Sequence, residues 1–346
     1  MTRPSDEYLA PSFEIDSAAA TAVAEKPQPL PDLREKPVVV TGAAGFVGTR
    51  VCTELVTGGW KVRAVVRDTR KAAQRIGHLA LEMRVGDIRD AETMRAAMKD
   101  AGSLVHLAAI AIEKSGDDYD STNTDATRVL IDAARTESVE RIVYMSQNGA
   151  DSRSPYRFLR SKGVAQDVVT ESSARWTVLR PSVIFGREDE FVNVLARLVR
   201  LSPLLFPLPG GGSARFQPVA VSDVAKAVVQ VLEQDSSVRQ IYTLGGLTPL
   251  TLRQMTERIL IAMNASRFLI GVPVGVIRPL VAVLQRVLPN PPVTTSLLDL
   301  LAVDNTVDQN ELQNQLGIDP VPFAPEELLY LRKITLSSAM RSLFRR

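Results

Sequence analysis

Cysteine and histidine are scarce in this chain of 346 residues. Its single cysteine is Cys52, so a disulfide within the chain is excluded and a reducing compartment is favoured. With one cysteine and 2 histidines, a zinc site built from the usual ligands is not expected, and no metal site is predicted. The formal net charge of +2 and the lack of an RNA- or DNA-reading motif give no reason to expect a nucleic-acid partner.

Long uncharged apolar runs are also missing. A membrane-spanning helix needs about 20 consecutive apolar residues, and the nearest candidate, residues 268–288, is interrupted by Pro273, Arg278, Pro279 and Arg286. No basic segment followed by an apolar core is found near the first residue, so no secretory signal is predicted. We therefore expect a cytoplasmic protein, with peripheral attachment to the inner face of a membrane as the alternative.

The chain divides by composition into three parts. Residues 1–35 are rich in Ala, Pro, Ser and acids, which leaves little to bury and predicts a flexible segment. Residues 36–250 alternate short apolar strands with helices, the pattern of right-handed βαβ crossovers in a parallel sheet. Residues 251–346 lose that alternation and predict a helical cap with a basic tail, to which residues 186–217 contribute. The expected fold class is α/β: a doubly wound parallel Rossmann sheet with a smaller, mainly helical C-terminal cap.

A glycine loop lies between the first predicted strand and the helix after it. In a Rossmann fold the first glycine permits the tight turn, the second lets the backbone approach a pyrophosphate, and the third lets helix and strand pack closely. The free N–H groups and the positive dipole end of the helix then favour phosphates. The loop predicts a dinucleotide site that includes Gly42, Ala44, Gly45, Phe46, Val47 and Gly48.

The end of the second predicted strand carries Arg67 followed by Asp68. An acid at this place bonds the ribose 2′-hydroxyl of NAD, whereas an arginine accommodates the 2′-phosphate of NADP. Arg67 is in the better position, and a guanidinium grips a phosphate through two parallel hydrogen bonds. NADPH is therefore the favoured cofactor and NADH the alternative.

Further motifs resemble the extended and atypical short-chain dehydrogenase/reductases. They are Gly-Asp-Ile at 86–88, His-Leu-Ala-Ala at 106–109, Asn123 opening a helix, Arg-Pro-Ser-Val-Ile-Phe-Gly at 180–186 and the segment 216–225. The resemblance implies that Asp87 and Ile88 lie beside the adenine and that Ala108 lies near the pyrophosphate and ribose. It places Pro181, Ser182 and Val183 near the nicotinamide. Ala109 and Asn123 are further implied members of the cofactor site.

The catalytic set of that superfamily is a tyrosine, a lysine four residues later and an upstream serine. Here the residue four before Lys162 is Phe158, which has no ionisable proton, and Tyr156 comes two residues too early. Ser146 ends the fifth predicted strand, just before the position usually taken by the catalytic hydroxyl. Lys162, Tyr156 and Ser146 are the candidate catalytic residues, and Lys162 and Ser146 are also cofactor candidates. We predict that the cofactor is bound and that standard Tyr–Lys catalysis is lost.

The segments 156–162, 179–193 and 289–294 resemble the atypical subgroup of the nucleotide-binding accessory subunit of respiratory complex I, whose known member holds NADPH without turning it over. The resemblance implies an accessory or assembly subunit of a membrane respiratory, complex I-like, or quinone-related system. The alternatives are an active NADP-dependent reductase of a bulky apolar carbonyl or quinone-type substrate, and a sensor of the NADPH/NADP ratio. The oligomeric state stays open.

The C-terminal part carries a second signal. Residues 266–303 are rich in Val, Leu, Ile and Pro, and residues 329–346 combine apolar side chains with cations and no acids. One interpretation is a core and a solvated terminal helix. The other is a surface for a membrane or a membrane protein complex, which would be a partner besides the dinucleotide.

Overall fold

The computed structural model describes residues 33–113, 116–289, 291–301 and 303–344. The predicted flexible segment 1–35 lies outside this part of the chain except for its last residues. Leu33–Glu35 form one 3-10 turn, and Leu33 is buried against the core of the sheet.

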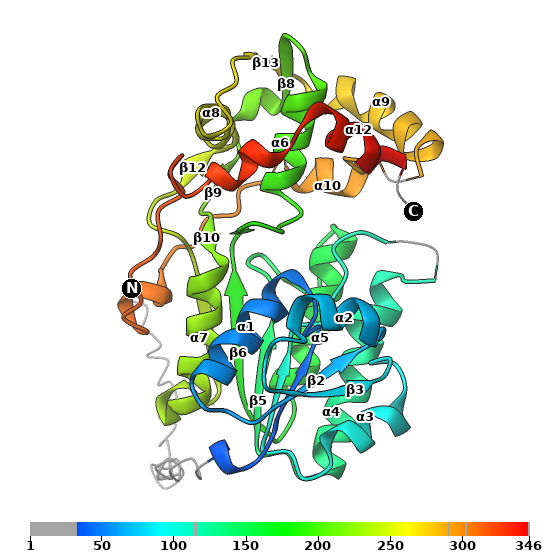
Figure 1. The fold of residues 1–346 in the computed structure, drawn as a ribbon, viewed down its shortest axis with the longest axis vertical. Coiled ribbons are helices and arrows are strands. Elements are labelled where there is room, and N and C mark those ends of the chain that lie inside the picture. Colours follow the sequence, from blue (N-terminus) through cyan, green and yellow to red (C-terminus); the bar gives the residue numbers. More distant parts are fainter. Residues whose placement is uncertain (1–32, 114–115, 290, 302, 345–346) are drawn as a thin grey trace, which may run out of the picture.

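Seven parallel strands form the central sheet, in the order β11-β6-β5-β4-β1-β2-β3 (Figure 1). Their bounds are β1 Val38–Thr41, β2 Val62–Val66, β3 Glu82–Val85, β4 Ser103–His106, β5 Arg141–Met145, β6 Arg175–Pro181 and β11 Gln240–Leu244. From β1 the chain runs outward to β3 and then crosses back to β4 on the other side of β1. The strand order reverses between β1 and β4, and ligands of such sheets bind beyond the carboxyl ends of the strands at this switch point. The predicted doubly wound α/β fold is confirmed.

Helices cover both faces of the sheet, so its strands are apolar on both sides. One core joins the sheet to α1 (Phe46–Thr57), α2 (Thr69–Ile76) and α7 (Val221–Glu233). The other core joins it to α3 (Ala91–Met98), α4 (Ala126–Thr136) and α5 (Arg157–Thr170). The helices α2 and α3 begin where an aspartate side chain accepts hydrogen bonds from the first turn, at Asp68 and Asp90.

A third core builds the cap, which lies beyond the carboxyl end of the sheet (Figure 1). Its elements come from two stretches of the chain. The first stretch gives β7 (Ile184–Phe185), α6 (Val192–Leu201), β8 (Leu205–Pro209) and β9 (Arg215–Phe216). The second gives β12 (Leu250–Thr251), α8 (Leu252–Ala262), β13 (Phe268–Val272), α9 (Val274–Val287), α10 (Thr295–Leu300) and α12 (Leu336–Phe344).

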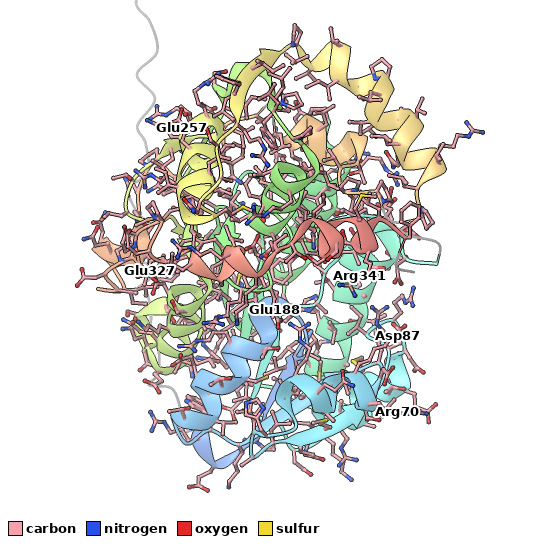
Figure 2. The ribbon with its side chains drawn as sticks, turned by 45° about the horizontal axis from the view of Figure 1, so that its top comes forward. Arg70, Asp87, Glu188, Glu257, Glu327 and Arg341 are labelled. Carbon is pink, nitrogen blue, oxygen red and sulfur yellow. The ribbon has the colours of Figure 1, made fainter. Side chains whose placement is uncertain are left out.

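The two stretches are joined by pairing between distant strands. β8 pairs with β13 in parallel, and β9 pairs with β12 in antiparallel. Figure 2 shows Glu257, on α8, at the opposite end of the molecule from Asp87 and Arg70. The run at 268–288 forms β13 and α9, separated by Pro273. Within the described ranges, no helix combines the length and apolar character that crossing a bilayer requires.

Candidate functional site

The glycine loop folds as its spacing predicts. Gly42 has φ of +71°, and its carbonyl accepts a hydrogen bond from the Gly45 amide at 2.9 Å. A Cβ on Gly48 would lie 2.1 Å from the Gly42 oxygen, so only glycine allows α1 to pack this close to β1. Gly45 caps α1 without a side chain, which leaves the N–H groups of the first turn available to an anionic ligand.

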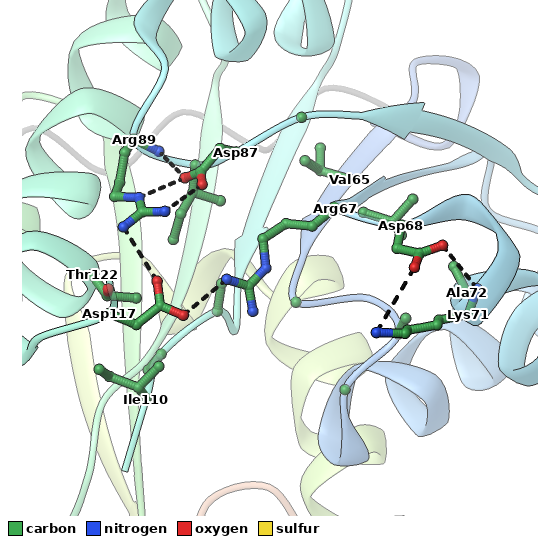
Figure 3. Close-up of a pocket in the computed structure, with 18 of the residues that line it drawn as sticks. Val65, Arg67, Asp68, Lys71, Ala72, Asp87, Arg89, Ile110, Asp117 and Thr122 are labelled. Atoms are coloured by element: carbon green, nitrogen blue, oxygen red, sulfur yellow. Dashed lines mark hydrogen bonds and ion pairs between the residues drawn. The ribbon is translucent and has the colours of Figure 1, made fainter. Parts of the chain in front are cut away.

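A cavity of about 530 Å³ opens beside this loop, at the carboxyl ends of β1, β2 and β3 (Figure 3). It is where the adenosine half of a dinucleotide lies in a Rossmann fold. Eight of the predicted cofactor residues line it, namely Gly42, Ala44, Gly45, Arg67, Asp87, Ile88, Ala108 and Ala109. The sequence motifs and the topology therefore point to the same place.

Charged side chains form a network along one wall of this adenosine cavity (Figure 3). Arg67 pairs with Asp117 at 3.1 Å, and Asp117 pairs with Arg89 at 3.2 Å. Arg89 also pairs with Asp87 at 2.6 Å, and its hydrogen bonds hold the pKa of the Asp87 carboxyl below its usual range. Asp68 instead turns to its own helix, where one carboxylate oxygen accepts hydrogen bonds from the Arg70 and Lys71 amides at 2.9 and 3.2 Å.

Two further cations line the cavity, and the sequence reasoning missed them. Lys71 and Arg75 are four residues apart on α2, a spacing that puts side chains on one face of a helix. Arg67 comes four residues before Lys71, just ahead of the helix. Arg75 also forms an ion pair with Glu188, which lies just after β7. The regular spacing was the signal that could have found both residues.

Lys162 lies on α5, and its side chain is buried. Its Nζ donates a hydrogen bond to the Met145 carbonyl at 2.7 Å and lies 4.5 Å from the centre of the Tyr144 ring. No acid is among these partners, and burial lowers the pKa of Lys162 to about 7. Ser146, the next residue after Met145, is buried too, and its Oγ has no hydrogen-bond partner among the described residues.

The ring of His106, at the end of β4, is held by two hydrogen bonds. Its nitrogens are bonded to the hydroxyls of Thr41 at 2.8 Å and Thr127 at 3.0 Å. Burial, assisted by the charge of Lys162, lowers the pKa of His106 to about 3. His106 is therefore a neutral side chain that holds β4 to its neighbours.

The structure places Tyr156 and Phe158 differently with respect to α5. Tyr156 is the capping residue before the helix, with extended backbone angles of φ −83° and ψ 115°. Phe158 lies in the first turn of α5, one turn before Lys162. The centre of its ring lies 5.8 Å from the centre of the Tyr119 ring. The position four residues before Lys162 thus carries a hydrocarbon ring without an ionisable proton.

A second cavity, of about 540 Å³, lies between the sheet and the cap. Tyr156 and Phe158 contribute to its wall. Of the predicted cofactor residues, Phe46, Ser182 and Val183 line it. Ser182 also holds the cap in place, because its hydroxyl donates to the Asn305 carbonyl at 2.6 Å.

The loop after β4 borders both cavities, since Ile110 lines the first and Ala111 the second. Asn123 fixes this loop: its side chain accepts from the Ile110 amide at 2.8 Å and donates to the Ile110 carbonyl at 3.1 Å. Asn123 therefore positions the wall of the site. The predicted residues outside the two sets of lining residues are Val47, Gly48, Asn123, Ser146, Lys162 and Pro181.

Comparison with known proteins agrees with this geometry. Residues 42–235 match the family model described as NAD(P)H-binding. The chain belongs to this family. Its motifs and its relatives make it an atypical member of the short-chain dehydrogenase/reductases.

Two relatives are similar over most of the chain. NADH dehydrogenase [ubiquinone] 1 alpha subcomplex subunit 9, mitochondrial, of Arabidopsis thaliana is 28% identical over 82% of this chain and 73% of its own length. The NADH-ubiquinone oxidoreductase 40 kDa subunit, mitochondrial, of Neurospora crassa is 22% identical over 85% of this chain and 78% of its own.

Two solved structures share the fold. The UDP-glucose 4-epimerase of Thermus thermophilus, in complex with NAD, has a TM-score of 0.66 at 19% identity and covers 88% of this chain and 99% of its own. The dTDP-glucose 4,6-dehydratase of Streptomyces venezuelae, with NAD and TYD bound, has a TM-score of 0.65 at 19% identity, covering 86% and 96%.

Proposed function

We propose that this protein holds NADPH without reacting with it and serves as an accessory or assembly subunit of a membrane respiratory, complex I-like system. The observation that carries the proposal is the pairing of a complete glycine loop with Phe158. The loop and its cavity keep what binding requires, whereas the group that passes a proton in related enzymes is replaced by a phenyl ring.

The residues present suit a dinucleotide. Gly42 and Gly48 leave room that any Cβ would fill, next to uncapped N–H groups suited to a pyrophosphate. Thr122 lines the adenosine cavity with a buried hydroxyl that has no partner among the described residues, and the same is true of the buried Ser146 hydroxyl near Lys162. Buried polar groups normally have partners, so both hydroxyls are suited to ribose or amide groups of a ligand. When bound, the nicotinamide supplies hydride chemistry; Lys162 would hold ribose hydroxyls beside it.

The charges around the adenosine cavity support NADPH over NADH. The acid that could bond a ribose 2′-hydroxyl is Asp68, and its carboxylate accepts amide hydrogen bonds from the first turn of α2. Arg67, Lys71 and Arg75 line the same cavity, and cations of this kind bind phosphate through charge-assisted hydrogen bonds. The donor set therefore suits a 2′-phosphate.

The accessory role rests on relatives that are themselves subunits. The Arabidopsis and Neurospora proteins carry names of NADH dehydrogenase and NADH-ubiquinone oxidoreductase subunits. A bound dinucleotide that is never consumed would act as part of the fold, since a ligand that binds only the folded state stabilises it. The proposal places this protein at the inner face of a membrane, beside such an assembly.

The test is to purify the protein, denature it and identify any dinucleotide that is released. The same preparation is then mixed with labelled NADPH to measure exchange. We expect about one NADPH per chain that exchanges slowly. A site that exchanges rapidly while an added quinone or carbonyl is reduced would contradict a binding-only role, and a chain that binds neither NADPH nor NADH would overturn the proposal altogether.

A second candidate function is reduction of a bulky apolar carbonyl or quinone-type compound. It is favoured by the wall of the second cavity. Apolar side chains such as Val183, Leu297 and Leu301 line it, and Tyr156 is the only phenol of the lining within the described part of the chain. This function requires that Tyr156→Phe abolish NADPH oxidation in the presence of such a compound. Equal rates for the variant and the wild type would remove the case for Tyr156 chemistry.

A further inference from the structure

Helix α9 exposes an apolar face along its whole length. Val276, Leu280, Val283 and Val287 follow the spacing of one helical face, and their exposed fractions are 66%, 61%, 59% and 71%. On the opposite face Val281 is buried at 6%, where the helix packs on α10. An amphipathic surface helix normally turns its apolar stripe inward, so α9 shows the unusual arrangement of apolar side chains on both faces.

The strand before α9 extends this apolar surface. Phe268, at the start of β13, is 67% exposed, and Ile270 is 39% exposed. Phe268 lies directly opposite Leu205 of β8 in the parallel pair, and Leu205 is itself 49% exposed. Figure 1 places the β8–β13 pair at the end of the cap farthest from the nucleotide-binding sheet, and α9 continues from there along the side of the cap. We call this surface, formed by the exposed residues of β8, β13 and α9, the distal cap face.

The ionisable side chains of the segment that carries β13 and α9 are of one sign. Between residues 258 and 298 the chain has no aspartate or glutamate, and its ionisable residues are Arg258, Arg267, Arg278 and Arg286. Arg267 donates to backbone carbonyls, among them Val199 at 3.2 Å. Within the described part of the chain, no carboxylate forms an ion pair with Arg267.

A second stripe of the same kind lies on α12. Leu336, Met340 and Phe344 recur at intervals of four residues and are 57%, 47% and 63% exposed. The chain from residue 328 onward has no acid, and Arg341 on α12 bonds the Ser337 carbonyl. The end of α12 lies near α9, because Ser342 and Gln285 border one cavity.

We propose that the distal cap face docks on a bilayer that contains anionic phospholipids. Exposed apolar patches of this kind mark interaction sites, and a helix with apolar side chains and cations but no acids is suited to the boundary between headgroups and acyl chains. Val276, Leu280, Val283 and Val287 enter that boundary, and Arg286 reaches the phosphates as long cationic side chains do at membrane surfaces.

Charge decides between a bilayer and a second copy of this chain. Two copies meeting through the same face would bring their arginines together, and like charges across an interface oppose association. An anionic lipid surface instead attracts each arginine that lies near it. Docking through this face goes beyond holding a dinucleotide, because the exposed residues that form it line neither of the two cofactor cavities.

The test is co-sedimentation of the full chain with vesicles. One set is phosphatidylcholine alone, and the other is phosphatidylcholine with about one-third phosphatidylglycerol. Leu280→Glu combined with Val283→Glu places two acids on the exposed face of α9. Leu247→Glu is the matched control, because Leu247 is 54% exposed in the loop after β11. NADPH binding of each variant is measured in the same preparation and reports both folding and the dinucleotide site.

We expect the wild type and Leu247→Glu to sediment with the anionic vesicles, and the double variant to bind them at least about tenfold more weakly with NADPH binding unchanged. Neutral vesicles should bind the wild type several-fold less than anionic ones. Three results would overturn the proposal: wild type that stays off anionic vesicles, equal vesicle binding by the double variant, or a wild-type dimer that the double variant converts to monomer. None of these results bears on whether the protein holds NADPH.

Discussion

Arg75 and Glu188 form an ion pair that joins the nucleotide-binding part of the chain to the segment leading into the cap. Arg75 lies on α2 and lines the adenosine cavity, whereas Glu188 follows β7 and borders the adjoining cavities. The Nε of Arg75 is buried without a hydrogen-bond partner among the described residues. The pair therefore ties α2, at the edge of the adenosine cavity, to the segment that leads into the cap.

The first prediction concerns release of the dinucleotide. Glu188→Gln removes the charge that holds Arg75 to the cap segment, so NADPH should dissociate about two- to fivefold faster, the range expected for a partly exposed ion pair. The measurement is made by stopped flow. Bound NADPH is displaced by excess NADP⁺, which does not fluoresce, and the loss of the fluorescence of bound NADPH gives the rate of dissociation. High salt should bring the wild type closer to the variant, because salt screens exposed charges.

A matched control is Glu140→Gln. It breaks the ion pair between Glu140 and Lys36, whose Oε1 and Nζ atoms are 2.8 Å apart and which lies away from both cavities. Its NADPH release should equal that of the wild type. If Glu188→Gln and Glu140→Gln release NADPH at the same rate, the Arg75–Glu188 pair has no part in holding the cofactor.

The second prediction separates NADPH from NADH. Arg67→Ala should weaken NADPH binding about tenfold, since a hydrogen bond to a charged group contributes about 1.5–3 kcal/mol. NADH lacks the 2′-phosphate, so its affinity should stay within about twofold. Calorimetric titration with each dinucleotide gives both constants. Arg70→Ala is the control, because Arg70 is an exposed arginine in the first turn of α2 and does not line the cavity. Equal losses for both dinucleotides in Arg67→Ala would refute a 2′-phosphate contact.

The sheet could be predicted from the sequence because its signals are local. The glycines at 42, 45 and 48 sit between a strand and a helix in the chain as in the fold, and the β-branched run before them matches β1 within its bounds. Pairing of β8 with β13 left no comparable signal, because it joins strands about sixty residues apart and depends on tertiary packing.

The candidate site divides in the same way. Several of the motif residues line the adenosine cavity, and the structure adds that Asp68 caps α2. Tyr156 was judged by its position on a regular helix, yet it precedes the helix. The contact between Arg75 and Glu188 joins residues that only the folded chain brings together.

The third prediction follows from the buried lysine. Burial lowers the pKa of Lys162 to about 7, whereas lysine in an unfolded chain has a pKa of about 10.4. Between these values the unfolded chain binds the proton and the folded chain does not, so the free energy of unfolding rises with pH in this window. The dinucleotide-free protein should therefore gain a few kcal/mol of stability from about pH 7 to about pH 10.

Lys162→Met isolates this contribution. Methionine fills much of the same volume without a charge, so the variant should be more stable than the wild type near pH 7, and the difference should shrink as the pH rises toward 10. Urea unfolding at several pH values measures the free energy of unfolding of the wild type and of Lys162→Met. Lys99→Met changes an exposed lysine and is the control, whose free energy of unfolding should follow that of the wild type. Parallel pH curves for Lys162→Met and the wild type would show that Lys162 keeps its proton when folded, held by the Met145 carbonyl and the Tyr144 ring.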